Sequence, residues 1–261
     1  MRAIILGAGY GTRLRKSAEG TDHYQYIKET PKPLLDIAGK PLLNHIVDKI
    51  SLLEVSEVRI IANNYYQSRF EEWEQKYASS YDVPIKIIYN GSNEYGKNLG
   101  AVRDLIIALG YDKTYNVEPF EDECMVFFGD KWPSANLEQM QTLMQEKNST
   151  IIGIQDLSSL EKMAQKSQIE LDHNNKVIYF EEKAPNPKFT LTCPGFYFIK
   201  QEDCKLIQNF FGQNKLPDAP GNLIQYLFEE GASIHGHKID EEPYDFGDLE
   251  AYLRVKNILE K

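Results

Sequence analysis

Short apolar runs alternate with longer amphipathic segments through the first half of the chain. Four runs have the length and composition of buried strands, and they occupy residues 2–6, 58–62, 85–89 and 124–128. Between and after them, apolar side chains recur at spacings of three and four, which predicts helices over 41–54, 65–78, 99–109 and 136–147. This alternation predicts a mostly parallel sheet covered by helices.

The pattern changes after a further predicted strand at 149–155. Three alternating segments follow, at 168–172, 176–183 and 192–199. Asn174 and Asn175 separate the first two, and asparagine suits a hairpin turn because it tolerates positive φ. We therefore predict an α/β fold: a Rossmann-like, mostly parallel mixed sheet flanked by helices, with a small antiparallel lobe.

Composition and charge exclude several classes of protein. The chain has 261 residues, of which 42% are hydrophobic, enough for one α/β domain with a full core. Its formal net charge of −10 argues against a nucleic-acid or anionic-membrane partner, which would require a broad basic face. A few well-placed cations and a metal ion could still bind phosphates locally.

The cysteines and the N-terminus predict the compartment. Cys124, Cys193 and Cys204 are odd in number and lack metal-type spacing, so we expect reduced thiols. The N-terminal apolar run is too short for a signal peptide, and no stretch approaches the ~20 apolar residues of a membrane span. We expect a cytoplasmic protein without a membrane partner.

The loop after the first strand is the candidate site. Gly7, Gly9 and Gly11 allow backbone N–H groups to crowd around an anion, and Thr12 and Arg13 add a hydroxyl and a permanent charge. The spacing of the glycines matches neither the dinucleotide fingerprint nor the P-loop. Alone, this loop is equally compatible with a tight turn. With Arg13 beside it, the loop predicts phosphate recognition.

Several motifs, taken together, resemble a known family. They are GAGYGTRL (7–14), TPKPLLDIAGKPLL (30–43), LGAVRDL (99–105), FFGDKW (127–132), EEKAPNPK (181–188), PGFYFI (194–199) and YDFGDLEAYL (244–253). The chain resembles the sugar-1-phosphate nucleotidylyltransferases of the glucose-1-phosphate thymidylyltransferase type over essentially its whole length. The resemblance implies an Mg²⁺-dependent transfer from an NTP to a sugar 1-phosphate. Whether the protein forms a homo-oligomer is left open.

The resemblance also implies roles for individual residues and parts of the chain. Arg13, Lys32, Asp130 and Asp245 would be catalytic, and the two aspartates would bind Mg²⁺. The nucleotide site would comprise Gly7, Ala8, Gly9, Gly11, Thr12, Arg13, Lys32, Asn98 and Gly100. Glu182 would bind a sugar hydroxyl, Lys183 the sugar phosphate, and Gly195 would let the sugar approach the backbone. The nucleotide-binding part would span about 1–155, the sugar-binding lobe about 156–247 and a closing helix 248–261.

Some positions depart from the family pattern. Relatives that use thymidine triphosphate commonly have glutamine where Gly100 aligns, so base identity stays open, with a pyrimidine favoured. Asn98 could bind a base edge or cap a helix. Segment 16–30 is longer than expected, and we predict a loop or flap over the nucleotide. The prolines on both sides of Lys32 are expected to exclude a helix there.

Two rival functions remain at this stage. A cytidylyltransferase of the same fold could act on another phosphomonoester, such as phosphocholine or a phosphonate. For a cationic acceptor we would expect an aromatic or acidic cage, and the 16 tyrosines keep this alternative open. A non-catalytic sugar-nucleotide-binding regulatory protein is the other alternative, which the intact set of charged motif residues argues against.

Overall fold

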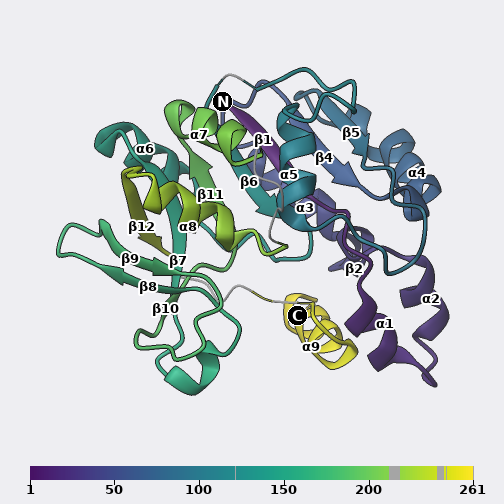
Figure 1. Ribbon diagram of the computed structural model, residues 1–261. Coiled ribbons are helices and arrows are strands. Elements are labelled where there is room, and N and C mark those ends of the chain that lie inside the picture. The colour runs from purple at the N-terminus through teal and green to yellow at the C-terminus, as the bar shows by residue number, and fades with distance from the viewer. Residues whose placement is uncertain (121, 212–217, 240–243, 245, 261) are drawn as a thin grey trace.

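One sheet runs through the whole molecule (Figure 1). The computed structural model describes residues 1–120, 122–211, 218–239, 244 and 246–260. The strand order is β5-β4-β1-β6-β11-β7-β10-β8-β9, with β12 also paired to β7. The bounds are β1 Arg2–Leu6, β4 Val58–Ala62, β5 Ile85–Tyr89, β6 Cys124–Phe128, β7 Thr150–Asp156, β8 Gln168–Leu171, β9 Val177–Glu181, β10 Leu191–Thr192, β11 Phe196–Ile199 and β12 Ile234–Lys238.

The pairing divides this sheet into a parallel and an antiparallel part. β5, β4, β1 and β6 are mutually parallel, and β12 is parallel to β7. β11 lies antiparallel between β6 and β7, and β10, β8 and β9 continue as antiparallel strands. Asn175 has φ of 62° in the turn between β8 and β9. The predicted mixed sheet, the antiparallel part and the asparagine turn are therefore confirmed.

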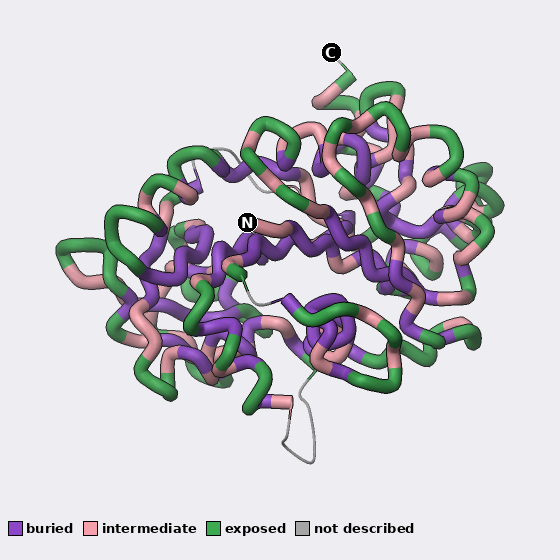
Figure 2. The backbone as a smooth tube through the Cα atoms, turned by 90° about the horizontal axis from the view of Figure 1, so that it is seen from above, coloured by how far each residue is buried: buried purple, intermediate pink, exposed green. Residues whose placement is uncertain are grey.

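Helices cover both faces of the sheet. They are α1 Thr12–Ala18, α2 Tyr24–Glu29, α3 Leu42–Ile50, α4 Gln67–Tyr77, α5 Ala101–Leu109, α6 Leu137–Lys147, α7 Gln201–Phe211, α8 Gly221–Glu229 and α9 Leu249–Leu259. Ala3 and Ile5 of β1 share a core with α3, α4, α6 and α9, whereas Ile4 shares a second core with α5, α7 and α8. Buried backbone accordingly runs through the centre of the molecule (Figure 2). None of the described helices is long and apolar enough to cross a bilayer.

Segment 16–30 folds into helices, so the prediction of a loop was wrong. It contains the end of α1 and all of α2, and Ala18 and Ile27 are buried in the core that α3 and α4 share. α1 and α2 contain only seven and six residues. Helices this short present too few apolar positions for a periodic pattern to show.

Lys32 also departs from expectation, because it begins a short 3-10 helix, Lys32–Leu34. Pro31 is the N-cap, and Leu34 N donates a 2.8 Å hydrogen bond to its carbonyl. Pro33 is tolerated because the first N–H groups of a helix have no partner within the helix. The prolines therefore start a helical turn instead of excluding one.

Candidate active site

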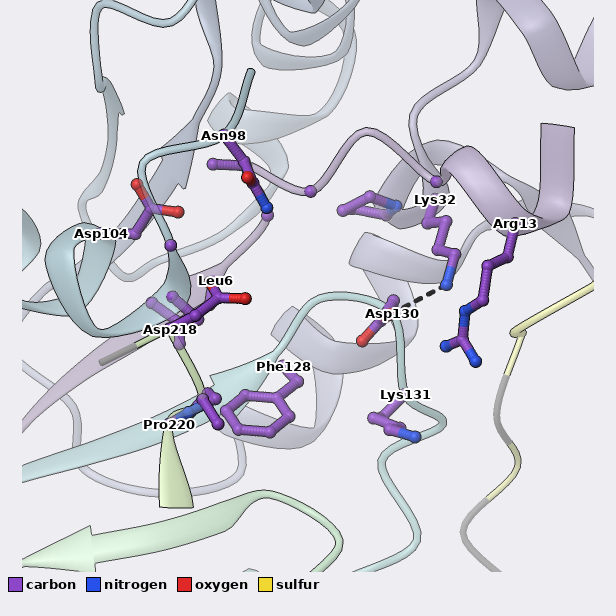
Figure 3. A pocket seen from close by; sticks show the side chains of 18 of the residues that line it. Leu6, Arg13, Lys32, Asn98, Asp104, Phe128, Asp130, Lys131, Asp218 and Pro220 are labelled. Atoms are coloured by element: carbon purple, nitrogen blue, oxygen red, sulfur yellow. Dashed lines mark hydrogen bonds and ion pairs between the residues drawn. The ribbon is translucent and has the colours of Figure 1, made fainter. Parts of the chain in front are cut away.

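A cavity of about 610 Å³ lies beyond the carboxyl ends of β1 and β6 (Figure 3). Leu6, the last residue of β1, and Phe128, the last of β6, both line it. The loop between β1 and α1, the start of α5 and residues before α8 complete its walls. Open α/β sheets bind ligands at such strand ends, so this cavity is the candidate site.

The glycine loop is held in place by the neighbouring strand. Gly7 N donates to Ile61 O at 2.8 Å, so this amide serves the sheet. Asn63 follows β4, is fully buried, and donates from Nδ2 to Ala8 O at 2.8 Å. Gly11 is left-handed, with φ of 62°, and α1 begins directly after it. The loop therefore enters the cavity as a fixed turn with Gly9 exposed.

An ion pair crosses the cavity between two predicted catalytic residues. Lys32 Nζ lies 3.1 Å from Asp130 Oδ2, and the lysine stem passes over Gly11. Burial by itself would raise the pKa of Asp130, but the charges of Lys32 and Lys131 bring that pKa below its ordinary value. Asp130 is therefore held as an anion, while 38% of its side chain stays exposed. An exposed, ionised carboxylate can bind a further cation.

Further positive charges surround this pair. Figure 3 shows Arg13, Lys32 and Lys131 around Asp130. Lys183 lines the same cavity, and its φ of 52° is unusual for a residue with a side chain. Backbone in sparsely populated regions concentrates at functional sites. The arrangement forms a local cationic end in an acidic protein, as phosphate binding requires.

A second cavity of about 210 Å³ adjoins the first and shares Phe128, Glu182 and Pro220 with it. Besides Lys131 and Lys166, its walls carry uncharged hydrogen-bonding side chains, namely Gln155, Gln165, Ser167, Thr192 and Tyr197. Burial raises the pKa of Glu182, and neighbouring Lys183 opposes that rise. Such a lining suits a ligand with several hydroxyl groups.

Glu182 is positioned by α8. Its backbone N–H donates to Gln225 Oε1 at 2.9 Å, and its carboxylate fills the space where Gly221 has no side chain. Because Gly221 is the first residue of α8, the carboxylate lies at a helix N-terminus, where the helix dipole favours negative charge. No family motif joins these two residues.

The opposite end of the larger cavity is formed by Asn98, Gly100 and Asp104. Asp104 is only 6% exposed, and Asn90 Nδ2 donates to its Oδ1 at 2.7 Å. Burial raises the pKa of Asp104 to about 6, although the Asn90 bond lowers it. Asn98 makes no side-chain cap on α5, whose N-cap is Gly100. This leaves the Asn98 amide exposed at the cavity.

Most predicted site residues line this one cavity. They are Gly7, Ala8, Gly9, Gly11, Arg13, Lys32, Asn98, Gly100, Asp130, Glu182 and Lys183. Thr12 is instead exposed as the first residue of α1, and Gly195 makes room for the Phe128 ring, which a Cβ would overlap. Asp245 lies outside the described residues. The roles assigned to these residues remain predictions.

The described residues include no group of three or more Asp, Glu, His or Cys side chains able to hold a metal ion. Mg²⁺ commonly uses one or two carboxylates together with substrate phosphates and water. Asp130, ionised, partly exposed and close to Lys32, Lys131 and Arg13, fits that role. The donor set is therefore compatible with a metal that arrives together with a phosphate substrate.

The fold and the cavity define an α/β protein with a cluster of cations beside a polar pocket at the strand ends. The chain belongs to the nucleotidyl transferase family, whose model matches residues 2–261. It is 28% identical over 261 residues to the bifunctional protein GlmU of Methanocaldococcus jannaschii, covering 98% of this chain and 55% of that protein. The chain thus spans about half the length of that relative.

Two further relatives have informative names. A UTP–glucose-1-phosphate uridylyltransferase of Synechocystis is 23% identical, over 100% of this chain and 64% of the relative. Among solved structures, a protein described as a glucose-1-phosphate thymidylyltransferase from Bacillus anthracis matches with a TM-score of 0.76 and 19% identity, covering 100% of this chain and 96% of that one. The structural likeness confirms the predicted fold.

Proposed function

We propose that the protein transfers a nucleotidyl group from an NTP to a sugar 1-phosphate, releasing pyrophosphate. An oxygen of the acceptor phosphate forms a bond to the α-phosphorus, and the bond between this phosphorus and the bridging oxygen breaks. Pyrophosphate leaves with the electron pair. The observation that carries this proposal is the continuity of a cavity that has a cationic end with a polar pocket of sugar size. The names of the relatives point the same way.

In this proposal the chain's own residues bring two polyanions together. Arg13 and Lys32 hold the triphosphate, and Lys183 docks the phosphate of the acceptor. The acceptor is already anionic near neutral pH, since phosphomonoesters have a second pKa of about 6, so no strong general base is needed. Asp130 would hold Mg²⁺, which when bound supplies neutralisation of the phosphates. Positioning and electrostatic stabilisation therefore provide the rate enhancement.

The smaller pocket favours a sugar over a cationic acceptor. Its amide and hydroxyl side chains match sugar hydroxyls, and Glu182 can accept from one of them. Tyr197 is the one tyrosine among the described residues that line this pocket, and a cluster of other tyrosines lies elsewhere: Arg15 lies 4.1 Å from the centre of the Tyr95 ring, and Tyr10, Tyr65 and Tyr95 contact one another. Neither Arg15 nor any tyrosine of this cluster lines either cavity. The ring of Tyr95 in this cluster is thus already in contact with a cation of the protein itself.

A substrate panel tests the proposal. UTP, dTTP, CTP and GTP are each combined with glucose, mannose, galactose and N-acetylglucosamine 1-phosphates, with phosphocholine and phosphoethanolamine as further acceptors. We expect pyrophosphate release with a pyrimidine triphosphate and a hexose 1-phosphate. Selective use of CTP with phosphocholine would establish the rival acceptor. Tight NDP-sugar binding without turnover of any pair would favour the regulatory alternative.

Asp130→Asn tests the proposed metal ligand. The substitution keeps the size of the side chain but removes the charge that would hold Mg²⁺. We expect Mg²⁺-dependent pyrophosphate release to fall by about 10²- to 10³-fold. Asp82→Asn, which changes an exposed aspartate outside both cavities, serves as the matched control. Near-normal turnover of folded Asp130→Asn at limiting Mg²⁺ would refute the assignment.

The location and the remaining metal ligand also belong to the proposal. Cys124 and Cys204 are buried as free thiols with their sulfur atoms 3.8 Å apart, which is compatible with a reducing compartment such as the cytoplasm. Asp245 is proposed as the second Mg²⁺ ligand on the family motif alone. Asp245→Asn is expected to reduce turnover as Asp130→Asn does, and unaltered activity would remove it from the site.

A further inference from the structure

An aspartate that the family motifs do not include lies at the Gly100 end of the larger cavity. Asp218 lines that cavity but not the smaller pocket. A Cβ built on Gly100 would come within 2.8 Å of Asp218 Oδ1, so the carboxylate lies directly over the start of α5. Figure 3 shows it on the opposite side of the cavity from Arg13 and Lys32.

We propose that Asp218 accepts hydrogen bonds from the ribose hydroxyls of the bound nucleotide and thereby selects ribonucleotides over 2′-deoxyribonucleotides. This inference rests on the proposed nucleotidyl transfer. It adds a specificity residue that neither the glycine loop nor the metal motif supplies.

The positions of the cations decide which part of the substrate reaches Asp218. The phosphates must lie beside Arg13 and Lys32, because these cations are the groups that attract them. The nucleoside therefore extends toward the other end, where Asn98 and Gly100 form the wall. A carboxylate there would repel phosphate oxygens. Asp218 consequently faces the uncharged part of the nucleotide.

The hydrogen-bond donors of the nucleoside decide which uncharged group fits a carboxylate. Ionised carboxylates only accept hydrogen bonds, and a vicinal diol offers two O–H donors to one carboxylate. The imide of uracil or thymine offers a single N–H between two carbonyl oxygens, which a carboxylate would repel. Dinucleotide-binding folds likewise use an acidic side chain to bind the ribose 2′-hydroxyl. The ribose is therefore the better match.

The sugar of the acceptor also carries diols, but the position of Asp218 favours the ribose as its partner. Glu182 already provides a carboxylate in the smaller pocket, whereas Asp218 does not line that pocket. Among the described residues, Asp218 makes neither an ion pair nor a hydrogen bond that would occupy its oxygens. Its side chain is thus available to a ligand in the larger cavity.

The test compares each ribonucleoside triphosphate with its 2′-deoxy counterpart, so it does not depend on which base the enzyme uses. Wild-type protein is expected to show a kcat/KM about tenfold to a hundredfold higher for the ribonucleotide, as loss of one charge-assisted hydrogen bond predicts. In Asp218→Ala the ratio should fall to near one, with KM for the sugar phosphate unchanged. Asp82→Asn should retain the wild-type ratio.

Calorimetric titration of the nucleotide alone adds a readout that needs no acceptor. The dissociation constants of the ribo and deoxy forms should differ in wild-type protein and converge in Asp218→Ala. Equal ratios in wild type and Asp218→Ala would overturn the inference, as would a change confined to KM for the sugar phosphate. Absence of turnover with every substrate pair would instead refute the proposed function. Unchanged melting of Asp218→Ala excludes a merely structural effect near α8.

Discussion

Glu182 and Gly221 are complementary in shape, and this contact makes the smaller pocket sensitive to one methyl group. Gly221 is helical, so alanine would cause no backbone strain there, but its Cβ would overlap the Glu182 carboxylate. The carboxylate must then rotate away from the shared wall of the two cavities. Pocket geometry therefore depends on a glycine that none of the family motifs includes.

For Gly221→Ala we expect about a tenfold or greater rise in KM for the sugar 1-phosphate, because a displaced hydrogen-bonding group loses its alignment with the substrate. KM for the NTP should change little. Steady-state kinetics with each substrate varied in turn measure both values. Asn222→Ala, one position further along α8, is the control. An equal rise in both KM values would show that the effect is not local to the acceptor.

The raised pKa of Asp104 predicts how stability depends on pH. The folded protein holds this proton up to a pKa of about 6, whereas the unfolded chain releases it near 3.8. Folding therefore binds a proton between these values, and stability falls as pH rises through the window. A shift of this size corresponds to at most about 3 kcal/mol.

Asp104→Asn should remove that dependence, since asparagine can still accept from Asn90 and carries no charge. Urea unfolding at pH 4.5 and 7.5 would give the free energies of unfolding. The difference between the two pH values should be smaller in the variant than in wild type, with the variant relatively more stable at pH 7.5. The same pH slope in both proteins would contradict the assignment of the shift to Asp104.

Some site residues could be predicted from the sequence because their surroundings are local. Gly11, Arg13 and Asp130 follow strands within a few positions, and strand ends meet at one edge of a parallel sheet. Asp218 could not be found this way, because its contact with Gly100 joins segments that no periodic pattern connects. Gly195 is the opposite case. The sequence marked it as a site residue, but in the structure the Phe128 ring occupies the space that a side chain at this position would fill, so packing alone explains the glycine.

The loop between β1 and α1 depends on the segment after β4. Asn63 donates to Ala8 O and accepts from Tyr66 N at 3.0 Å, so one buried amide joins the glycine loop to the start of the next helical segment. Buried polar groups left without partners cost about 1–3 kcal/mol each. The shape of the glycine loop is therefore set partly from outside the loop.

Asn63→Ala should lower the free energy of unfolding by about 1–3 kcal/mol and reduce kcat/KM for the NTP. Asn63→Asp provides the matched comparison, because it can still accept from Tyr66 N but cannot donate to Ala8 O. We expect Asn63→Asp to share the kinetic defect. Urea unfolding and initial rates measure the two effects. Wild-type kinetics in both variants would show that the loop holds its shape without Asn63.

Helices and strands were predictable where they are long enough to show a period. α4 and α6 each contain eleven residues and appear within the predicted ranges, with Phe70 and Trp73 of α4 buried in the core. α2 has one buried residue, Ile27, so its pattern resembles that of a polar loop. The turn at Lys32 was missed because proline was considered as a helix breaker and not as a helix starter.

The order of strands across the molecule was the least predictable feature. Predicted strands at 124–128 and 192–199 proved to be neighbours, since β11 pairs antiparallel with β6. This pairing joins the glycine-loop half to the half that carries Glu182. The cavity therefore lies at a junction that tertiary structure creates. This explains why the sequence identified residues that line the cavity but not which of them lie next to one another.

The C-terminal helix α9 returns to the N-terminal part of the chain (Figure 1). Val255 is fully buried in the core that Ala3 and Ile5 share. Tyr252 OH donates to Asp36 O at 3.0 Å, and Lys256 Nζ lies 2.8 Å from Asp36 Oδ2. Packing, a hydrogen bond and a partly exposed ion pair thus hold one helix.

These three contacts should contribute unequally to the free energy of unfolding, and single substitutions can rank their contributions. Val255→Ala removes buried methyl groups and should cost about 1–3 kcal/mol. Tyr252→Phe should cost about 1 kcal/mol, and Lys256→Ala less, because exposed ion pairs contribute ~0–1 kcal/mol. Urea unfolding of each variant gives the order. If Lys256→Ala cost as much as Val255→Ala, the ion pair rather than packing would anchor α9, and stability should then fall steeply with added salt.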